Sequence, residues 1–177
     1  MMSTRFGQIF WGLLLVILDF KINHIDLLPD FIGYILIAVG CGGLTSASRH
    51  FSTASTLSWI LVVLSLLAYA LRSDWASVYG FVHLAIDCAT MWFLLGGVME
   101  LATARQRPDL CERASNRRVA YVTLMCIATL AGFVAQISRD AAMFMVVVWA
   151  VCIVLLLFLI LHLIHRARHE LTDDHAA

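Results

Sequence analysis

The chain has 177 residues, of which 62% are hydrophobic and 14% are charged, and its mean hydropathy is +0.89. Soluble domains are usually about half apolar and about a quarter charged. A soluble domain of this length could not bury so much apolar surface, because small domains keep a large surface-to-volume ratio. The zero net charge also excludes a basic nucleic-acid binder. The composition therefore predicts an integral membrane protein with a single domain.

Six apolar segments come close to the roughly 20 residues that a transmembrane helix needs. In chain order they are residues 6–20, 27–44, 53–71, 78–101, 119–137 and 141–164. We therefore predict an all-α fold, a polytopic transmembrane bundle of about six helices at residues 1–165, followed by a polar tail at 166–177. The first segment is short, so it either crosses the membrane or forms half of a re-entrant hairpin.

Lysine and arginine are distributed unevenly between the two predicted sides of the membrane. One side carries nine of the twelve, namely Arg5, Arg49, Arg105, Arg107, Arg113, Arg117, Arg118, Arg166 and Arg168. The other side carries Lys21, Arg72 and Arg139. Cytoplasmic loops of membrane proteins are enriched in basic residues. Both termini and the long charged loop predicted at 102–118 are therefore expected in the cytoplasm.

Ionisable residues are densest between residues 19 and 34, in the stretch DFKINHIDLLPDFIGY. They are Asp19, Lys21, His24, Asp26 and Asp30. Pro29 suits the first turn of a helix, where its missing N–H has no partner in any case. The helix dipole favours carboxylates at the same place. One interpretation is a capped helix start with surface charges, and the other is an outward-facing acidic and histidine cluster that binds a cation or a lipid head group.

A second polar position lies inside the fourth apolar segment. His83 and Asp87 are four residues apart and share one helix face. Asp87 lies roughly 13 Å past Val78, close to the middle of the bilayer. An isolated carboxylate there is expected to become neutral, whereas pairing with His83 allows it to stay charged. The pair either fixes helix register or serves a function, and we expect it to face the bundle interior together with Asp30.

Glycines and cysteines add little chemistry. Gly33, Gly40 and Gly97 are predicted to let helices approach closely. The cysteines, at 41, 88, 111, 126 and 152, show no C-x-x-C spacing, and the chain has no common catalytic or nucleotide-binding motif. The set His24, Asp26, His83 and Asp87 is a weak metal-site signal. No metal and no cofactor are predicted. Trp75 and Tyr79 suit the outer interface belt of a membrane protein.

The run INHIDLLPDFIGYILIAVGCGGL carries a family resemblance. Its matching residues are Asp26, Leu28, Pro29, Asp30, Gly33 and Tyr34, and the run GGVMELA with Leu110 and Arg113 adds to them. It resembles the signature between the first two helices of an uncharacterised family of small bacterial integral membrane proteins. The resemblance implies a bacterial inner membrane and brings no activity with it. DLLPDFI also resembles a motif of another small membrane-associated family, but the Ile-Pro and Asp pair that follow there are missing here.

Three functions remain open. The first is a non-enzymatic module that binds an ion, a lipid head group, a protein partner or a second copy through the outer cluster. The second is a small transporter or channel component with His83–Asp87 as a proton or cation relay. The third is a membrane enzyme that acts on a lipid-linked substrate with Asp26, Asp30, His83 and Asp87. One cavity shared by Asp30, Asp87 and a histidine would favour transport or catalysis, and a sealed Asp87 would favour the module.

Overall fold

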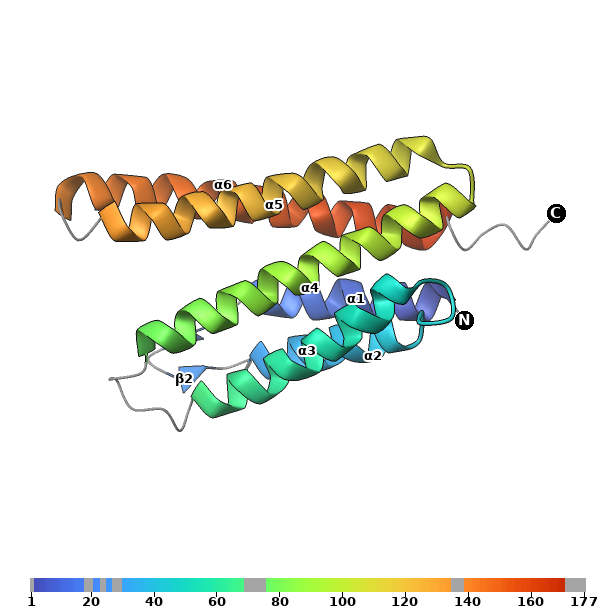
Figure 1. The fold of residues 1–177 in the computed structure, drawn as a ribbon, viewed down its shortest axis with the longest axis horizontal. Helices are drawn as coiled ribbons and strands as arrows, with labels where there is room; N and C mark the ends of the chain where they lie inside the picture. The colour runs from blue at the N-terminus through green and yellow to red at the C-terminus, as the bar shows by residue number, and fades with distance from the viewer. Residues whose placement is uncertain are drawn as a thin grey trace.

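Six helices run back and forth along one axis in the computed structural model of the chain (Figure 1). The structure describes residues 2–17, 21–22, 25–26, 30–68, 76–134 and 139–170. The helices are α1 (Met2–Ile17), α2 (Asp30–Gly42), α3 (Arg49–Ala68), α4 (Ala76–Ala104), α5 (Pro108–Val134) and α6 (Arg139–Glu170). Between α1 and α2, the two-residue strands β1 (Lys21–Ile22) and β2 (Ile25–Asp26) pair antiparallel. The predicted all-α fold with about six helices is confirmed.

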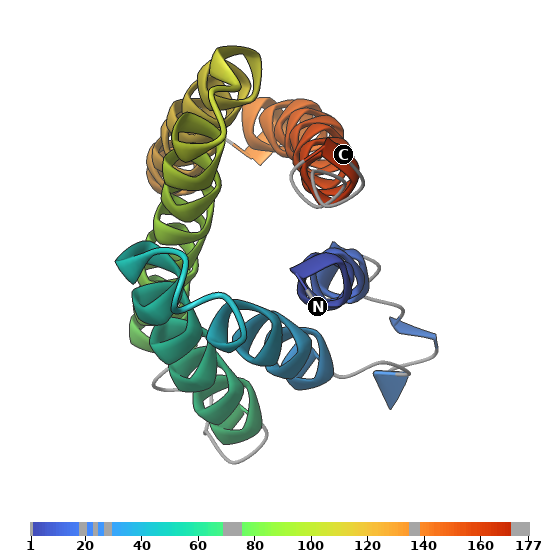
Figure 2. The ribbon, with the colours of Figure 1, turned by 90° about the vertical axis from the view of Figure 1, so that its right-hand side faces the viewer.

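The helices form a ring rather than a layered bundle. Each helix packs against the next one in the chain, and α6 returns to pack against α1. Figure 2, which looks along the helices, shows this arrangement. We call the end with the start of α1, the turns at 43–48 and 105–107 and the end of α6 the terminal end. The opposite end, with β1, β2 and the start of α4, is the distal end.

Three helices among the described residues are long and apolar enough to cross a membrane. They are Arg49–Ala68, Val78–Ala104 and Val147–Glu170. The helix in the second predicted segment is shorter than expected. It is α2, which has 13 residues and is therefore about 20 Å long. The hydrocarbon core is about 30 Å thick. Two consecutive glycines, Gly42 and Gly43, stand where α2 ends, and glycine disfavours a continuing helix.

The prediction of a long loop at 102–118 is wrong. Most of this segment is helical, since only a short turn separates α4 from α5. Gln106 adopts a left-handed conformation with φ of 54°, and the Arg107 N–H donates to the Ala102 carbonyl at 2.9 Å. This is a compact way to end a helix. Pro108 then starts α5, at the position where its missing N–H costs nothing.

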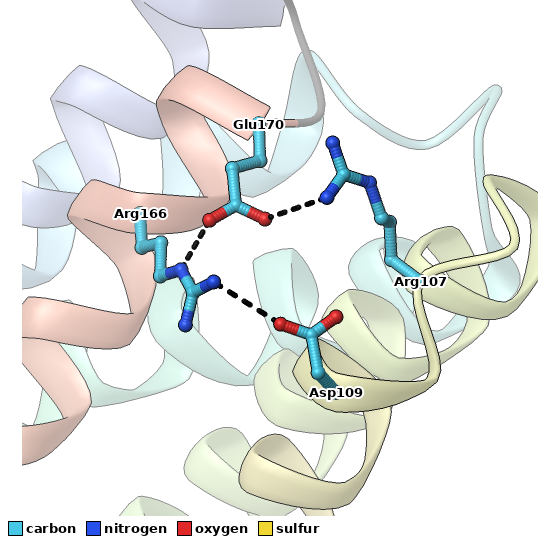
Figure 3. Close-up of polar contacts among 4 residues, drawn as sticks. All are labelled: Arg107, Asp109, Arg166 and Glu170. Atoms are coloured by element: carbon cyan, nitrogen blue, oxygen red, sulfur yellow. Dashed lines mark hydrogen bonds and ion pairs between the residues drawn. The ribbon is translucent and has the colours of Figure 1, made fainter.

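Ion pairs hold the terminal ends of α5 and α6 together (Figure 3). Arg166 donates to Glu170 one turn along α6 and reaches Asp109 of α5 at 3.1 Å. Arg107 lies 3.4 Å from the same Glu170 carboxylate. The polar tail predicted from residue 166 is thus partly wrong, because α6 continues to Glu170 and Ala167 is fully buried.

Close helix contacts depend on glycine at three positions. A Cβ on Gly33 would lie 2.8 Å from the Gly12 carbonyl oxygen, and a Cβ on Gly40 would lie 2.9 Å from the Arg5 carbonyl oxygen. The backbones of α1 and α2 therefore touch. A Cβ on Gly97 of α4 would meet the buried ring of Phe51 at 2.9 Å.

The apolar core lies mainly toward the terminal end. Its largest fully buried side chains are Phe6, Ile9, Leu44, Phe51, Leu61, Leu94, Leu95, Leu110, Ile160, Leu163 and Ile164. Most of these belong to the terminal halves of their helices. The distal half of the ring contains a cavity.

Candidate functional site

The cavity has a volume of about 700 Å³ and is lined by side chains from all six helices. Its polar lining consists of Asp30, Tyr34, Ser65, Tyr79, His83, Asp87, Thr90 and Tyr121. The exposed residues Ala68 and Gly80 line its distal end, and the fully buried Leu94 lines its other end. The cavity therefore opens toward the distal end and closes within the ring.

One face of α4 forms the longest wall of the cavity. Tyr79, His83, Asp87, Thr90 and Leu94 follow one another at intervals of three or four residues, and all of them line the cavity. At 1.5 Å per residue, this wall is roughly 22 Å long. His83 and Asp87 therefore face the interior of the ring and not its outer surface.

Asp87 lies at the centre of the polar wall and accepts bonds from two other helices. The Tyr121 hydroxyl of α5 donates to its Oδ2 atom. The Tyr34 hydroxyl of α2 approaches its Oδ1 atom at 3.5 Å, which is the outer limit of a hydrogen bond. His83 is close enough to act on the carboxylate electrostatically. The stronger of the two phenol contacts is therefore the one from Tyr121.

His83 lies between two aromatic rings. Its ring centre is 5.9 Å from that of Tyr34 and 5.8 Å from that of Tyr79. The Tyr79 hydroxyl donates to the Leu64 carbonyl of α3 at 3.0 Å, which fixes the ring in the cavity wall. Tyr79 therefore belongs to the cavity lining, although the sequence predicted a place in the interface belt.

Asp30 brings a second carboxylate to the cavity. It is the first residue of α2, one turn before Tyr34, and its side chain is half-buried. The carboxylate acts electrostatically on both Tyr34 and Tyr79. The hydroxyls of Ser65 and Thr90, in contrast, donate to carbonyls of their own helices at 2.7 and 2.8 Å. The polar groups with chemistry to offer are thus carboxylates, phenols and one imidazole.

The structure brings together only part of the predicted cluster. Asp30, His83 and Asp87 share the cavity. Asp19 and His24 lie outside the described residues, and only the backbone of Asp26 is described, in β2. Within the described part of the chain, no group of three His, Cys, Asp or Glu side chains is arranged to hold a metal ion.

The tyrosines are the site residues that the sequence analysis missed. Tyr34 follows Asp30 by four residues, so helical spacing could have placed the two on one face. Tyr121 carries no such signal, because it contacts Asp87 across 34 positions of sequence. Only the packing of α4 against α5 brings this phenol to the carboxylate.

No protein-family model, curated protein or solved structure matches the chain. The fold and the cavity define the class, which is a helical protein with an internal polar cavity and with three described helices long and apolar enough to cross a membrane. The cavity has room for a ligand, and its carboxylates and aromatic rings can stabilise a positive charge on that ligand. The imidazole of His83 and the carboxyl group of Asp87 are groups that can exchange protons.

Proposed function

We propose that the protein is a small cation transporter with the central cavity as its solute site. The observation that carries this proposal is the convergence of Asp30, His83 and Asp87 in one cavity lined by all six helices. Ionisable residues that line cavities within membrane bundles commonly mark substrate or ion pathways. A shared cavity is also the arrangement that favours transport or catalysis over a passive module.

The charge of the lining supports a cation as the solute. None of the described residues that line the cavity is Lys or Arg, while Asp30 and Asp87 are carboxylic acids. If His83 is protonated, it neutralises at most one of the two carboxylates. A cavity of this kind attracts cations and repels anions, most strongly where water is scarce.

The bonds of Asp87 offer a way to couple proton uptake to helix movement. As a carboxylate, Asp87 can accept from both Tyr34 and Tyr121, whereas a protonated carboxyl has a donor of its own and less acceptor capacity. Protonation therefore weakens a link between α4 and α2 or α5. The titratable groups that face or adjoin Asp87 are Asp30, Tyr34, His83, Cys88 and Tyr121.

A non-transporting binding module is the second candidate, and the closed end of the cavity favours it. Leu94 lines that end, and further buried apolar side chains lie beyond it toward the terminal end. Transport therefore requires a second conformation, as in alternating access, and an open channel does not fit this one. A module requires no second conformation.

We place the protein in the inner membrane of a bacterium, with both termini in the cytoplasm and the cavity open to the outside. The terminal end carries nine of the twelve lysines and arginines, which supports this orientation. Surrounding lipid is the expected partner, and the resemblance at residues 22–44 supports membership in the small bacterial family.

Ion flux into proteoliposomes tests the transport proposal. The purified protein is reconstituted with a trapped pH-sensitive dye, and a potassium diffusion potential drives protons inward. We expect faster acidification than in protein-free liposomes, and we expect Asp87→Asn to return it to that baseline. Glu112→Gln, which removes an exposed carboxylate outside this cavity, is the matched control and should keep wild-type flux. Wild-type proton flux equal to the protein-free baseline would contradict a proton pathway through the cavity and favour the module.

A further inference from the structure

The cavity has a polar half and an apolar half, and this division limits the kind of cation that it suits. Asp30, Tyr79 and His83 line the distal part, and Asp87 lies one turn of α4 further toward the closed end. Nearer the closed end, the lining turns apolar with Ile37, Met91, Leu94 and Leu157. A ligand that fills this space must combine a positive group with an apolar body.

Aromatic rings accompany the carboxylates in the polar half. Phe31, Tyr34, Tyr79 and Tyr121 all line the cavity, and two of them flank His83 within 6 Å between ring centres. Organic cations bind over the faces of such rings, and quaternary ammonium groups are commonly recognised by aromatic cages. Carboxylates beside rings thus favour a diffuse organic charge over a compact metal ion.

The size of the cavity leads to the same conclusion. A volume of about 700 Å³ lies within the range of about 300–1,000 Å³ that is typical of pockets for small organic ligands. A bare inorganic cation would leave most of it empty, and the described residues offer no metal-binding cluster. Met91 and Met125, which line different levels of the cavity, supply flexible, polarisable side chains that can adapt to apolar groups of different shapes.

We infer that the solute of the central cavity is a lipophilic organic cation, with its charge near Asp30 and Asp87 and its apolar groups against the closed end. This inference rests on the proposed function for its site and names the substrate class. It requires a protonated or quaternary centre, and it predicts rejection of an anion of the same shape.

Binding of tetraphenylphosphonium to the protein in lipid nanodiscs tests the inference. The matched probes are tetraphenylborate, an anion of nearly the same shape, and triphenylphosphine oxide, which is neutral, with empty nanodiscs to subtract partitioning into lipid. We expect saturable binding of the phosphonium alone. Equal saturable binding of either other probe, or none of the phosphonium, would overturn the inference.

Variants then locate the bound cation. We expect Asp30→Asn and Asp87→Asn to weaken phosphonium binding roughly tenfold or more, as expected when a desolvated charge partner is lost. Glu112→Gln should bind like the wild type. Gly80→Phe is a second way to test the site, because a Cβ there meets nothing within 4 Å and the ring would fill the distal opening. Unchanged affinity in folded Asp30→Asn, Asp87→Asn and Gly80→Phe proteins would overturn the inference.

The flux experiment and the binding experiment can contradict their proposals independently of each other. Phosphonium binding that depends on Asp30 and Asp87, without proton flux in proteoliposomes, supports the organic-cation site and contradicts proton transport through Asp87. Proton flux that depends on Asp87, without saturable phosphonium binding, supports transport and contradicts the organic-cation site.

Discussion

Asp87 shows how a single buried carboxylate can tie several helices together. Tyr121 of α5 donates to one of its oxygens and Tyr34 of α2 approaches the other, while His83 lies one turn away on α4 itself. A buried polar group left without a partner costs more than a hydrogen bond contributes. The phenols therefore matter for stability as well as for any proton chemistry.

We expect Tyr121→Phe to lower the free energy of unfolding by about 1–3 kcal/mol, because the Asp87 carboxylate loses its stronger hydrogen-bond donor. Tyr34→Phe should cost less, since its hydroxyl lies 3.5 Å from the carboxylate. Unfolding of the purified protein in detergent gives the values. In an Asp87→Leu background, which offers the phenol no acceptor, the cost of Tyr121→Phe should fall, with a coupling of about 0.5–3 kcal/mol. The same cost in both backgrounds would show that the bond adds no stability.

Helix packing depends on where small residues meet large rings. Gly96 and Gly97 are neighbours on α4 but face different surroundings. A Cβ on Gly97 would lie 2.9 Å from two carbons of the Phe51 ring, which is fully buried. A Cβ on Gly96 would lie 3.5 Å from His50, an ordinary contact distance. The two positions form a matched pair for testing the α3–α4 interface.

We expect Gly97→Ala to destabilise the protein by about 1–3 kcal/mol, because a buried ring has little room to move. Gly96→Ala should change stability by less than about 1 kcal/mol, because the contact with His50 is an ordinary one and the higher helix propensity of alanine stabilises α4. Thermal unfolding in detergent compares both variants with the wild type. Equal melting temperatures for the two variants would show that Phe51 does not constrain the spacing of α3 and α4.

The sequence predicted elements better than their ends and contacts. Apolar runs identified all six helices because burial in a membrane requires such runs. The prediction of a loop at 102–118 was wrong because this segment is rich in charged residues and has no apolar run, although a helix starts at Pro108. Spacing along one helix predicted the His83–Asp87 face, but no local pattern connects Tyr121 to Asp87. Contacts between distant segments depend on packing, which periodicity does not encode.

The whole molecule separates its charges along the axis of the ring. Nine of the twelve lysines and arginines belong to the terminal end, from Arg5 of α1 to Arg168 of α6. The candidate carboxylates Asp30 and Asp87 line the cavity in the distal half. This polarity predicts the orientation of the protein in the membrane, and hence the side from which a solute reaches the cavity.

Reporter fusions test this orientation. Positive residues are retained in the cytoplasm, so green fluorescent protein after Ala177 should fluoresce, and alkaline phosphatase after Gln106 or Ala177 should be inactive. Alkaline phosphatase after Ser73, between α3 and α4, should be active because it folds only outside the cytoplasm. Immunoblots that show equal amounts of each fusion are the control. Phosphatase activity after Gln106 with none after Ser73 would reverse the orientation, and the cavity would then open to the cytoplasm.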